Sequence, residues 1–238
     1  MFSIPTELTL RFEDRVRQDN TEFSIRSIYF PNPVLSDSPR MCLVAMEPAV
    51  REYKQDSLKD EIREGYVNFV CTPEDIILHY CLYISSGSTF NYHITDLSKG
   101  AMTLAEARKR RRERYKNWLP LLKEELTHFR NPQLLSFGCG PESFLKKTKD
   151  FETLGYMMHH SRNNSWRFLK ILNRYKQGEI PRDLHTKIKD FSDHLFDKIG
   201  YSARLRKKVV GDRFSSELKD WQKGMFLHYI ETLSSIFQ

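Results

Sequence analysis

The segment Met41–Met46 has the sequence MCLVAM, and this unbroken apolar run decides the fold. A strand with one face in water alternates apolar and polar residues, whereas a strand buried on both faces does not. Strands of the second kind are typical of parallel sheets, because helices cover both faces of such sheets. We therefore predict that Met41–Met46 is a central strand of a parallel sheet, which ends at Glu47-Pro48.

Three later segments have the composition of further strands, namely Tyr92–Thr95, Gln133–Gly138 and Leu154–Met158. Helical segments separate them. The clearest begins at Thr72, a cap residue that precedes a proline and two acidic residues, and it continues to about residue 84. Strands that alternate with helices favour parallel pairing through right-handed crossovers. The sequence thus predicts the α/β class with a central parallel four-stranded sheet.

Residues 103–129 are predicted to form one long helix. Its first half contains the basic run 108–114 (RKRRRER), and its second half has Trp118 and three leucines at helical spacing, which we assign to the core. A dense basic run is either a solvated face or a surface that holds a DNA backbone or the hydroxyl groups of a bulky base substituent. The basic cluster at residues 204–208 allows the same two interpretations.

The composition indicates a globular protein with a polyanionic partner. The chain has 238 residues, of which 39% are hydrophobic, and this is enough for one large domain or two small ones. We expect an α/β domain at residues 1–180 and a helical extension at residues 181–238 that packs on it. The formal net charge of +7 favours the polyanionic partner.

The sequence also indicates where the protein works. No apolar run is long enough to span a membrane, and the charged N-terminal residues exclude a signal peptide, so we expect a cytoplasmic protein. The four cysteines form no CxxC pair. This spacing argues against a structural metal or a disulfide framework and favours reduced, buried thiols.

Four candidate residues lie at the carboxyl ends of the predicted strands, namely Glu47, Asp96, Gly138 and His159. The carboxyl ends of parallel strands lie along one edge of a sheet, which is where α/β proteins bind ligands. Two carboxylates, a glycine that opens a helix and a histidine are the parts of a hydrolytic site. Each also has a plainer interpretation, since Glu47 can be a simple loop residue and His159 a structural histidine.

Four motifs, in this order, resemble those of the uracil-DNA glycosylase superfamily. Val44–Ala49 is similar to the family's first motif, a strand followed by Gly-x-Asp-Pro-Tyr or Gly-x-x-Pro-Gly. Tyr92–Met102 and Asn131–Gly138 resemble two strand segments of the thermophile-type branch, and Met158–Ser161 resembles the closing His-Pro-Ser motif. The resemblance covers about residues 40–165. It implies a three-layer sandwich, DNA glycosylase activity, and a monomer that binds double-stranded DNA.

Departures from the family pattern narrow the function that the resemblance implies. Lys99 is followed by Gly100 where the branch often has a cysteine, so we expect no iron–sulfur cluster, and we expect no metal or other cofactor. Ala49 replaces a tyrosine that packs against C5 of the base in some branches, and it would leave space for a substituent there. His160 stands in place of the closing motif's proline.

Asp96 falls where the family has an asparagine that recognises uracil. An asparagine amide donates to O4 and accepts from N3–H, whereas an ionised aspartate only accepts. An aspartate suits the exocyclic amine of cytosine. Together with Ala49 it predicts a substrate cytosine with a C5 substituent, such as hydroxymethyl- or glucosylated hydroxymethylcytosine. Some glycosylases of this fold excise the glucosylated base from phage DNA as a defence.

The resemblance assigns a role to each candidate residue. Glu47 would stabilise the oxocarbenium-like sugar and orient or activate water, and His159 would hydrogen-bond the leaving base. Met46, Ala49 and Asp96 would contact the flipped-out base. The expected DNA contacts come from Ser98, Lys99, Arg108, Arg111, Gly138, Gly140, Ser161, Arg162 and Asn163. Two alternatives remain, a uracil glycosylase of base-excision repair in which Asp96 is protonated, and a non-catalytic DNA-binding module of the same fold.

Overall fold

The computed structural model describes residues 3–51, 55–175, 180–211 and 217–237. The chain divides into two compact units. The first comprises Met1–Asn68 and Tyr92–Tyr156, and the second comprises Phe69–Asn91 and Met157–Gln238. The sequence-based boundary is at residue 180, whereas the C-terminal part of the second unit begins at Met157. The second unit also contains a segment from the middle of the predicted α/β domain.

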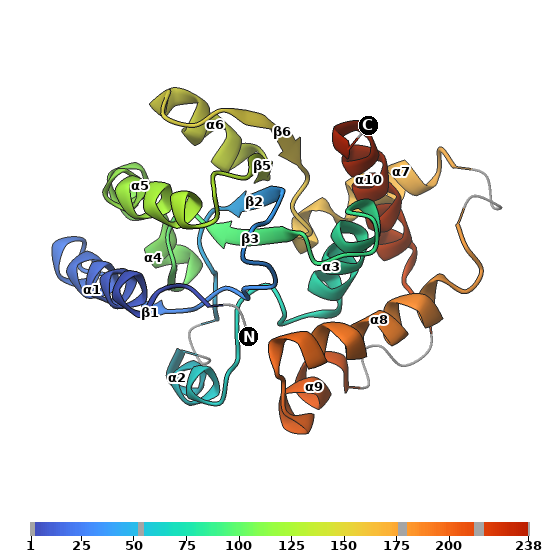
Figure 1. Cartoon of the computed structure of the whole chain (residues 1–238), viewed down its shortest axis with the longest axis horizontal. Helices are drawn as coiled ribbons and strands as arrows, with labels where there is room; N and C mark the ends of the chain where they lie inside the picture. Colours follow the sequence, from blue (N-terminus) through green and yellow to red (C-terminus); the bar gives the residue numbers. More distant parts are fainter. Residues whose placement is uncertain (1–2, 52–54, 176–179, 212–216, 238) are drawn as a thin grey trace. The chain divides into compact units, whose positions relative to one another are not determined.

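The first unit is built on the predicted parallel sheet. Its strands, hydrogen-bonded in the order β3-β2-β5-β6 (Figure 1), are β2 (Met41–Ala45), β3 (Tyr92–Asp96), β5 (Gln133–Phe137) and β6 (Thr153–Met157). The central strand β2 is buried along its whole length and pairs in parallel with both β3 and β5. The α/β class and the all-parallel four-stranded sheet are confirmed.

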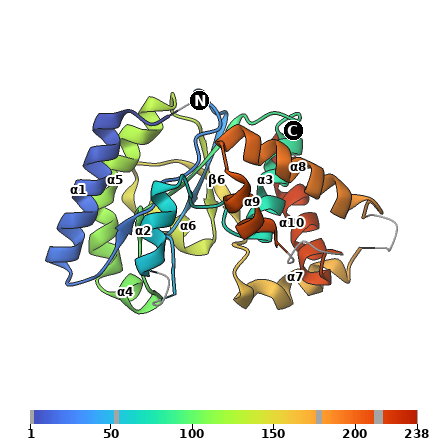
Figure 2. The same ribbon diagram turned by 90° about the horizontal axis from the view of Figure 1, so that it is seen from below.

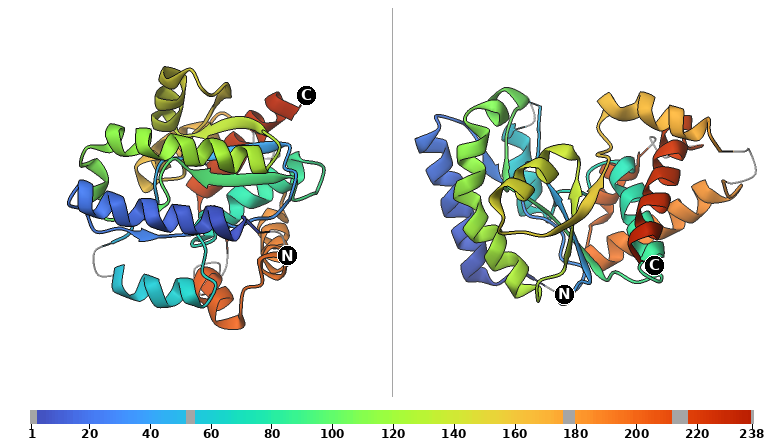
Figure 3. Two further views of the ribbon diagram at one scale, coloured as in Figure 1. Left: turned by 60° about the vertical axis from the view of Figure 1, so that its left-hand side comes forward. Right: turned by 90° about the horizontal axis from the view of Figure 1, so that it is seen from above.

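Two long helices of the first unit lie side by side, α1 (Thr6–Glu22) and α5 (Arg111–His128), as Figure 3 shows. Trp118 of α5 is only 1% exposed, and its indole Nε1 donates to Asp19 Oδ2 of α1 at 2.7 Å. The core position predicted for Trp118 is confirmed. The unit also contains α2 (Gln55–Arg63), α6 (Cys139–Thr148) and an antiparallel pair of short strands, β1 (Ile28–Tyr29) and β4 (Gly100–Ala101).

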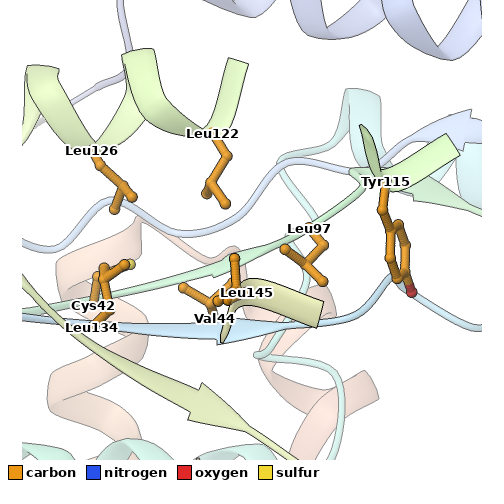
Figure 4. Packing of buried hydrophobic residues seen from close by; sticks show 8 residues of the cluster. All are labelled: Cys42, Val44, Leu97, Tyr115, Leu122, Leu126, Leu134 and Leu145. Carbon is orange, nitrogen blue, oxygen red and sulfur yellow. The ribbon is translucent and has the colours of Figure 1, made fainter. Parts of the chain in front are cut away.

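One core cluster joins the sheet to α5 and α6 (Figure 4). Leu122 and Leu126 point from α5 toward Cys42 and Val44 of β2. Burial of each such side chain stabilises the fold by about 1.5–3 kcal/mol. The members of the cluster are Cys42, Val44, Leu97, Tyr115, Leu122, Leu126, Leu134 and Leu145.

The single helix predicted over residues 103–129 is wrong, because the chain forms two helices there. The short helix α4 (Leu104–Arg108) begins with a capping box between Thr103 and Glu106. Helix α5 begins after Arg110. The φ of Arg110 is +41°, in the left-handed region, so a right-handed helix cannot continue through this residue. The helical propensity of the basic run does not reveal this break.

Side chains of α5 provide hydrogen bonds at the break. Arg111 Nε donates to the carbonyl of Ala107 at 3.0 Å. Arg114 donates to the carbonyls of Ala107 and Lys109 at 3.0 and 3.1 Å. These bonds satisfy carbonyls that the end of α4 leaves without helical partners. Two arginines of the basic run thus stabilise the turn at residues 107–114, which we call the α4–α5 corner.

The second unit is built mainly from helices (Figure 2). Its elements are α3 (Pro73–Ser85), the 3₁₀ turn η2 (Arg162–Asn164), α7 (Ser165–Leu172), α8 (Leu184–Ile199), α9 (Ala203–Val210) and α10 (Asp220–Phe237). Helix α3 packs against α8 and α10, and α10 packs against α7. The predicted cap at Thr72 is confirmed, since Thr72 and Asp75 form a capping box.

The cysteines are free thiols, as the sequence predicts, but not all of them are buried. Cys42 and Cys81 are buried, and Cys71 is partly buried. Cys139, the first residue of α6, is exposed. None of the described helices combines the length and the apolar character that a membrane span needs.

Replacement of Leu145 by alanine should lower the free energy of unfolding by about 2–5 kcal/mol, because it opens a cavity in the core cluster. Denaturant titration followed by circular dichroism measures the change. Leu104→Ala is the matched control, since Leu104 is 62% exposed and its truncation should change stability by less than about 0.5 kcal/mol. Equal effects of the two substitutions would contradict the core position of Leu145.

Candidate functional site

The chain segments after β2 and β3 stay paired beyond the sheet. In the register of the two strands, Ala45 is opposite Asp96. Leu97 N donates to the carbonyl of Ala45 at 2.9 Å, so the pairing continues past the end of β3. Glu47, two residues after Ala45, and Asp96 therefore lie at the same edge of the sheet. This is the carboxyl edge, where the sequence analysis places the site.

The end of β5 lies next to the end of β2. Gly138 has a φ of +106°, which favours glycine, and it leads into α6. A Cβ atom on Gly140 would lie 2.9 Å from Met46 Sδ, so glycine permits this close approach. The strand order reverses here, with β3 on one side of β2 and β5 on the other, and α/β sheets bind ligands at such points. Met46 also packs against the core cluster, while Ala49 is exposed.

Glu47 is held by donors from α5. Arg111 Nη2 donates to its Oε1 at 2.8 Å, and Arg114 Nη2 donates to its Oε2 at 3.2 Å. The hydroxyl of Tyr115 also donates to Oε2. Burial holds the pKa of Tyr115 well above its usual value, so the hydroxyl keeps the proton that it donates. The Glu47 side chain is 4% exposed, whereas Arg111 is 31% exposed. The guanidinium groups of Arg111 and Arg114 thus bond both Glu47 and the carbonyls of the α4–α5 corner.

Asp96 is a carboxyl group in a different environment. It is 2% exposed and accepts a hydrogen bond from Asn68 Nδ2 at 2.9 Å. Burial raises its pKa from 3.8 to about 7, although Lys99 and the hydrogen bonds of Asn68 and Asn32 oppose the rise. The negative charge of Glu47 adds to it. Asp96 therefore changes between the neutral and the ionised form near neutral pH, as general acids and bases do.

A buried ion pair lies in the same region of the first unit. Lys99 Nζ is 2.9 Å from Glu125 Oε2, and the two side chains are 2% and 0% exposed. Glu125 also accepts hydrogen bonds from His93 and Thr95 at 3.0 Å each. Burial alone would raise the pKa of Glu125, but Lys99 and His93 lower it to about 2. Burial lowers the pKa of His93, so its imidazole is a neutral donor to the carboxylate.

The sequence analysis missed Glu125, Asn32 and Asn68. Glu125 lies seven residues after Trp118 and three after Leu122, so it is on the apolar face of α5. A carboxylate on such a face is a signal of a buried, paired charge. Asn32 and Asn68 give no comparable signal, because both are in irregular segments between elements.

The predicted DNA contacts of the first unit differ in exposure. Arg108 is exposed, and Gly138 and Gly140 lie at the N-terminal end of α6. Ser98 is completely buried, and its hydroxyl has no hydrogen-bond partner among the described residues. Lys99 forms the buried ion pair. Ser98 and Lys99 are therefore as deeply buried as Asp96, whereas Arg108 faces the solvent.

The other predicted residues belong to the second unit. His159 stacks on His160 with ring centroids 4.7 Å apart. Burial, and then the neighbouring His160, lowers the pKa of His159 to about 3, so its imidazole is neutral. Ser161 is partly buried and Asn163 is exposed. The side chain of Arg162 lies outside the described residues.

His160 has a carboxylate partner. Its Nε2 lies 3.0 Å from Asp75 Oδ1. The other oxygen of Asp75 accepts the backbone N–H of Thr72 at 2.9 Å in the capping box of α3. His160 therefore links the segment that follows β6 to the start of α3.

No model of a known protein family matches the chain, and no curated protein matches its sequence significantly.

Replacement of Asp96 by asparagine should stabilise the protein above neutral pH. In the unfolded chain the carboxyl ionises near pH 4, whereas the folded chain holds the proton up to about pH 7. Stability therefore falls as pH rises between these values, by about 4 kcal/mol in total. The substituted asparagine is neutral at every pH and can still accept from Asn68, so the variant should gain stability at pH 8 and little at pH 4.

Thermal unfolding of Asp96→Asn and wild type across this pH range measures the difference. Asp37→Asn is the control, since Asp37 is exposed and its replacement should change stability little. A constant difference between Asp96→Asn and wild type over the whole range would show that Asp96 does not titrate there.

Proposed function

We propose that this protein is a DNA glycosylase that hydrolyses the N-glycosidic bond of a flipped-out cytosine with a C5 substituent and leaves an abasic site. The observation that carries the proposal is the pair of carboxyl groups, Glu47 and Asp96, at the carboxyl edge of a parallel sheet beside its topological switch point. The resemblance to the uracil-DNA glycosylase superfamily, with its three-layer sandwich, supplies the reaction class.

Asp96 is the proposed reader of the base. Asp96 is 2% exposed, and a hydrogen bond to a base edge is stronger in such a buried environment than in water. A carboxyl group with a proton donates to N3 of cytosine and accepts from the exocyclic amine. The exposed Ala49 follows Glu47 at the same edge and has no bulk to exclude a C5 substituent.

Glu47 is the proposed partner of the sugar and the attacking water. A carboxylate has roughly four acceptor sites. Two donors occupy Oε2, and one occupies Oε1. One site on Oε1 is therefore left for a water molecule, by this count of hydrogen bonds among the described residues. Water would add to C1′ as the C1′–N bond breaks, the base leaves with the electron pair, and Glu47 accepts the proton that the water loses.

His159 is the proposed stabiliser of the leaving base. The resemblance assigns this role to it, and burial keeps its imidazole neutral, so that the ring carries one N–H. A donor of this kind is worth about 2.7–4 kcal/mol in the transition state. For the DNA itself, the partly exposed Arg111 and the exposed Arg108 are the proposed backbone contacts, with the α6 N-terminus at Gly138 and Gly140.

A second candidate is a uracil-DNA glycosylase, and the raised pKa of Asp96 favours it. A protonated carboxyl group can donate to O4 of uracil and accept from N3–H. An ionised Asp96 would instead face O4 with a lone pair. The uracil activity of such an enzyme should therefore fall as pH rises above 7.

A panel of labelled duplexes separates the candidates. Each contains one U, C, 5-methylcytosine, 5-hydroxymethylcytosine or glucosylated hydroxymethylcytosine, and alkali converts abasic sites to strand breaks. We expect breaks at the C5-modified cytosines, with Glu47→Gln at least about 100-fold slower. Breaks only at U would favour the second candidate. DNA binding without breaks at any base would contradict the enzyme and favour a non-catalytic module.

Replacement of Ala49 by tyrosine tests the proposed space beside C5. The ring should fill it, so the variant should lose activity on glucosylated hydroxymethylcytosine by more than tenfold relative to unmodified cytosine, measured as single-turnover rates. Ala105→Tyr is the control, because Ala105 is an exposed residue of α4. Equal losses on modified and unmodified bases in Ala49→Tyr would remove Ala49 from substrate selection.

A further inference from the structure

A continuous set of hydrogen bonds in the first unit leads from the buried ion pair to Asp96. It contains Lys99, Glu125, Thr95, Asn32, Asn68 and Asp96. Its two ends differ in kind. At one end the groups can act in one way only, because an ammonium only donates and an ionised carboxylate only accepts. At the other end Asp96 can carry a proton on either oxygen.

The ion pair determines the direction of the hydrogen bonds that the hydroxyl of Thr95 makes. Lys99 donates to the hydroxyl oxygen of Thr95. The same hydroxyl lies 3.0 Å from both carboxylate oxygens of Glu125. A hydroxyl has one hydrogen, and Glu125 can only accept it. Thr95 must therefore donate to Glu125, and it has no hydrogen left for a third neighbour.

The direction of the Thr95 hydroxyl in turn determines how the side-chain amides of Asn32 and Asn68 are oriented. Asn32 lies 3.3 Å from Thr95 Oγ1 and must present its NH₂ group there. Its carbonyl oxygen then faces Asn68, whose NH₂ donates to it at 3.3 Å. The same NH₂ group donates to Asp96 Oδ2 at 2.9 Å. Each amide thus has one orientation in which all of these contacts are hydrogen bonds.

We infer that Asn32 and Asn68 are specificity-determining positioning residues, which keep Oδ2 of Asp96 as an acceptor and assign its proton to Oδ1. The two oxygens of Asp96 are then a fixed donor and a fixed acceptor when the group is neutral. The charges of Lys99 and Glu47, and the hydrogen bonds that Asp96 receives from Asn68 and Asn32, change how readily it takes up the proton.

A carboxyl group with a fixed polarity distinguishes the two pyrimidines, and here the inference rests on the proposed function. Cytosine presents a donor at position 4 and an acceptor at position 3, whereas uracil presents the reverse order. In one orientation of the base, Asp96 can match only one order. We commit to cytosine, with Oδ1–H directed to N3 and Oδ2 accepting from the amine. Nitrogen N3 of cytosine is basic enough to share this proton, and O4 of uracil is not.

Substitutions at Asn68 test the inference through the ratio of single-turnover rates on cytosine-edge and uracil-edge duplexes. Asn68→Ala removes the donor to Oδ2, so the proton can reside on either oxygen and the ratio should fall roughly 5- to 150-fold. Asn68→Asp places an acceptor there and attracts the proton to Oδ2, so uracil should become the better substrate. Asn117→Ala is the control, since the amide of Asn117 donates to the exposed Glu22 and its loss should leave the ratio unchanged.

A second measurement does not depend on activity. The side-chain NH₂ signal of Asn68, assigned by its loss in Asn68→Ala, should stay in a hydrogen-bonded position in ¹H–¹⁵N spectra on both sides of the Asp96 titration. A rotation of the amide when Asp96 takes up its proton would overturn the inference. So would an unchanged substrate ratio in Asn68→Ala. If the wild type cleaves no base but the NH₂ signal behaves as expected, the proposed function fails and the fixed polarity stands.

Discussion

The ion pair between Lys99 and Glu125 is the constraint on which the polar interior of the first unit depends. Two opposite charges removed from water are stable only if each is paired and its remaining capacity for hydrogen bonds is filled. His93 and Thr95 supply those bonds. A hydroxyl between a fixed donor and a fixed acceptor loses its freedom to rotate. The ion pair thus imposes order on neutral groups that would otherwise have several equivalent arrangements.

Two carboxyl groups of similar chemistry have different properties because different elements surround them. Strand pairing brings Glu47 and Asp96 to one edge of the sheet, but it does not give them different surroundings. Helix α5 then gives Glu47 two guanidinium groups and a phenol, while the irregular segments around Asn32 and Asn68 give Asp96 only amides. Enzymes often carry out acid–base chemistry at neutral pH with one carboxyl group that stays charged and another that can hold a proton.

The sheet could be predicted from the sequence because a strand that is buried on both faces has an unbroken apolar run, as Met41–Met46 does. The cap at Thr72 was equally readable, since its partners are three residues away. The break at Arg110 was not, because Arg111 and Arg114 beside it bond carbonyls of the corner and Glu47, which is more than sixty residues away in the chain. The positions of Glu47 and Asp96 at one edge followed from the parallel sheet. Their contrasting partners came from α5 and from loops, where the amino-acid pattern gives little guidance.

The α4–α5 corner has a consequence for local stability. Helix ends are commonly closed by a glycine, whereas here arginine side chains bond the end of α4 and Glu47 at once. Local opening of the corner would therefore loosen Glu47, and a ligand that draws the arginines away would loosen the corner. Amide hydrogen exchange at residues 107–110 thus reports on an event at the sheet edge. Because Arg111 and Arg114 bond both the end of α4 and Glu47, the exchange rates of these amides would change when the arginines leave Glu47.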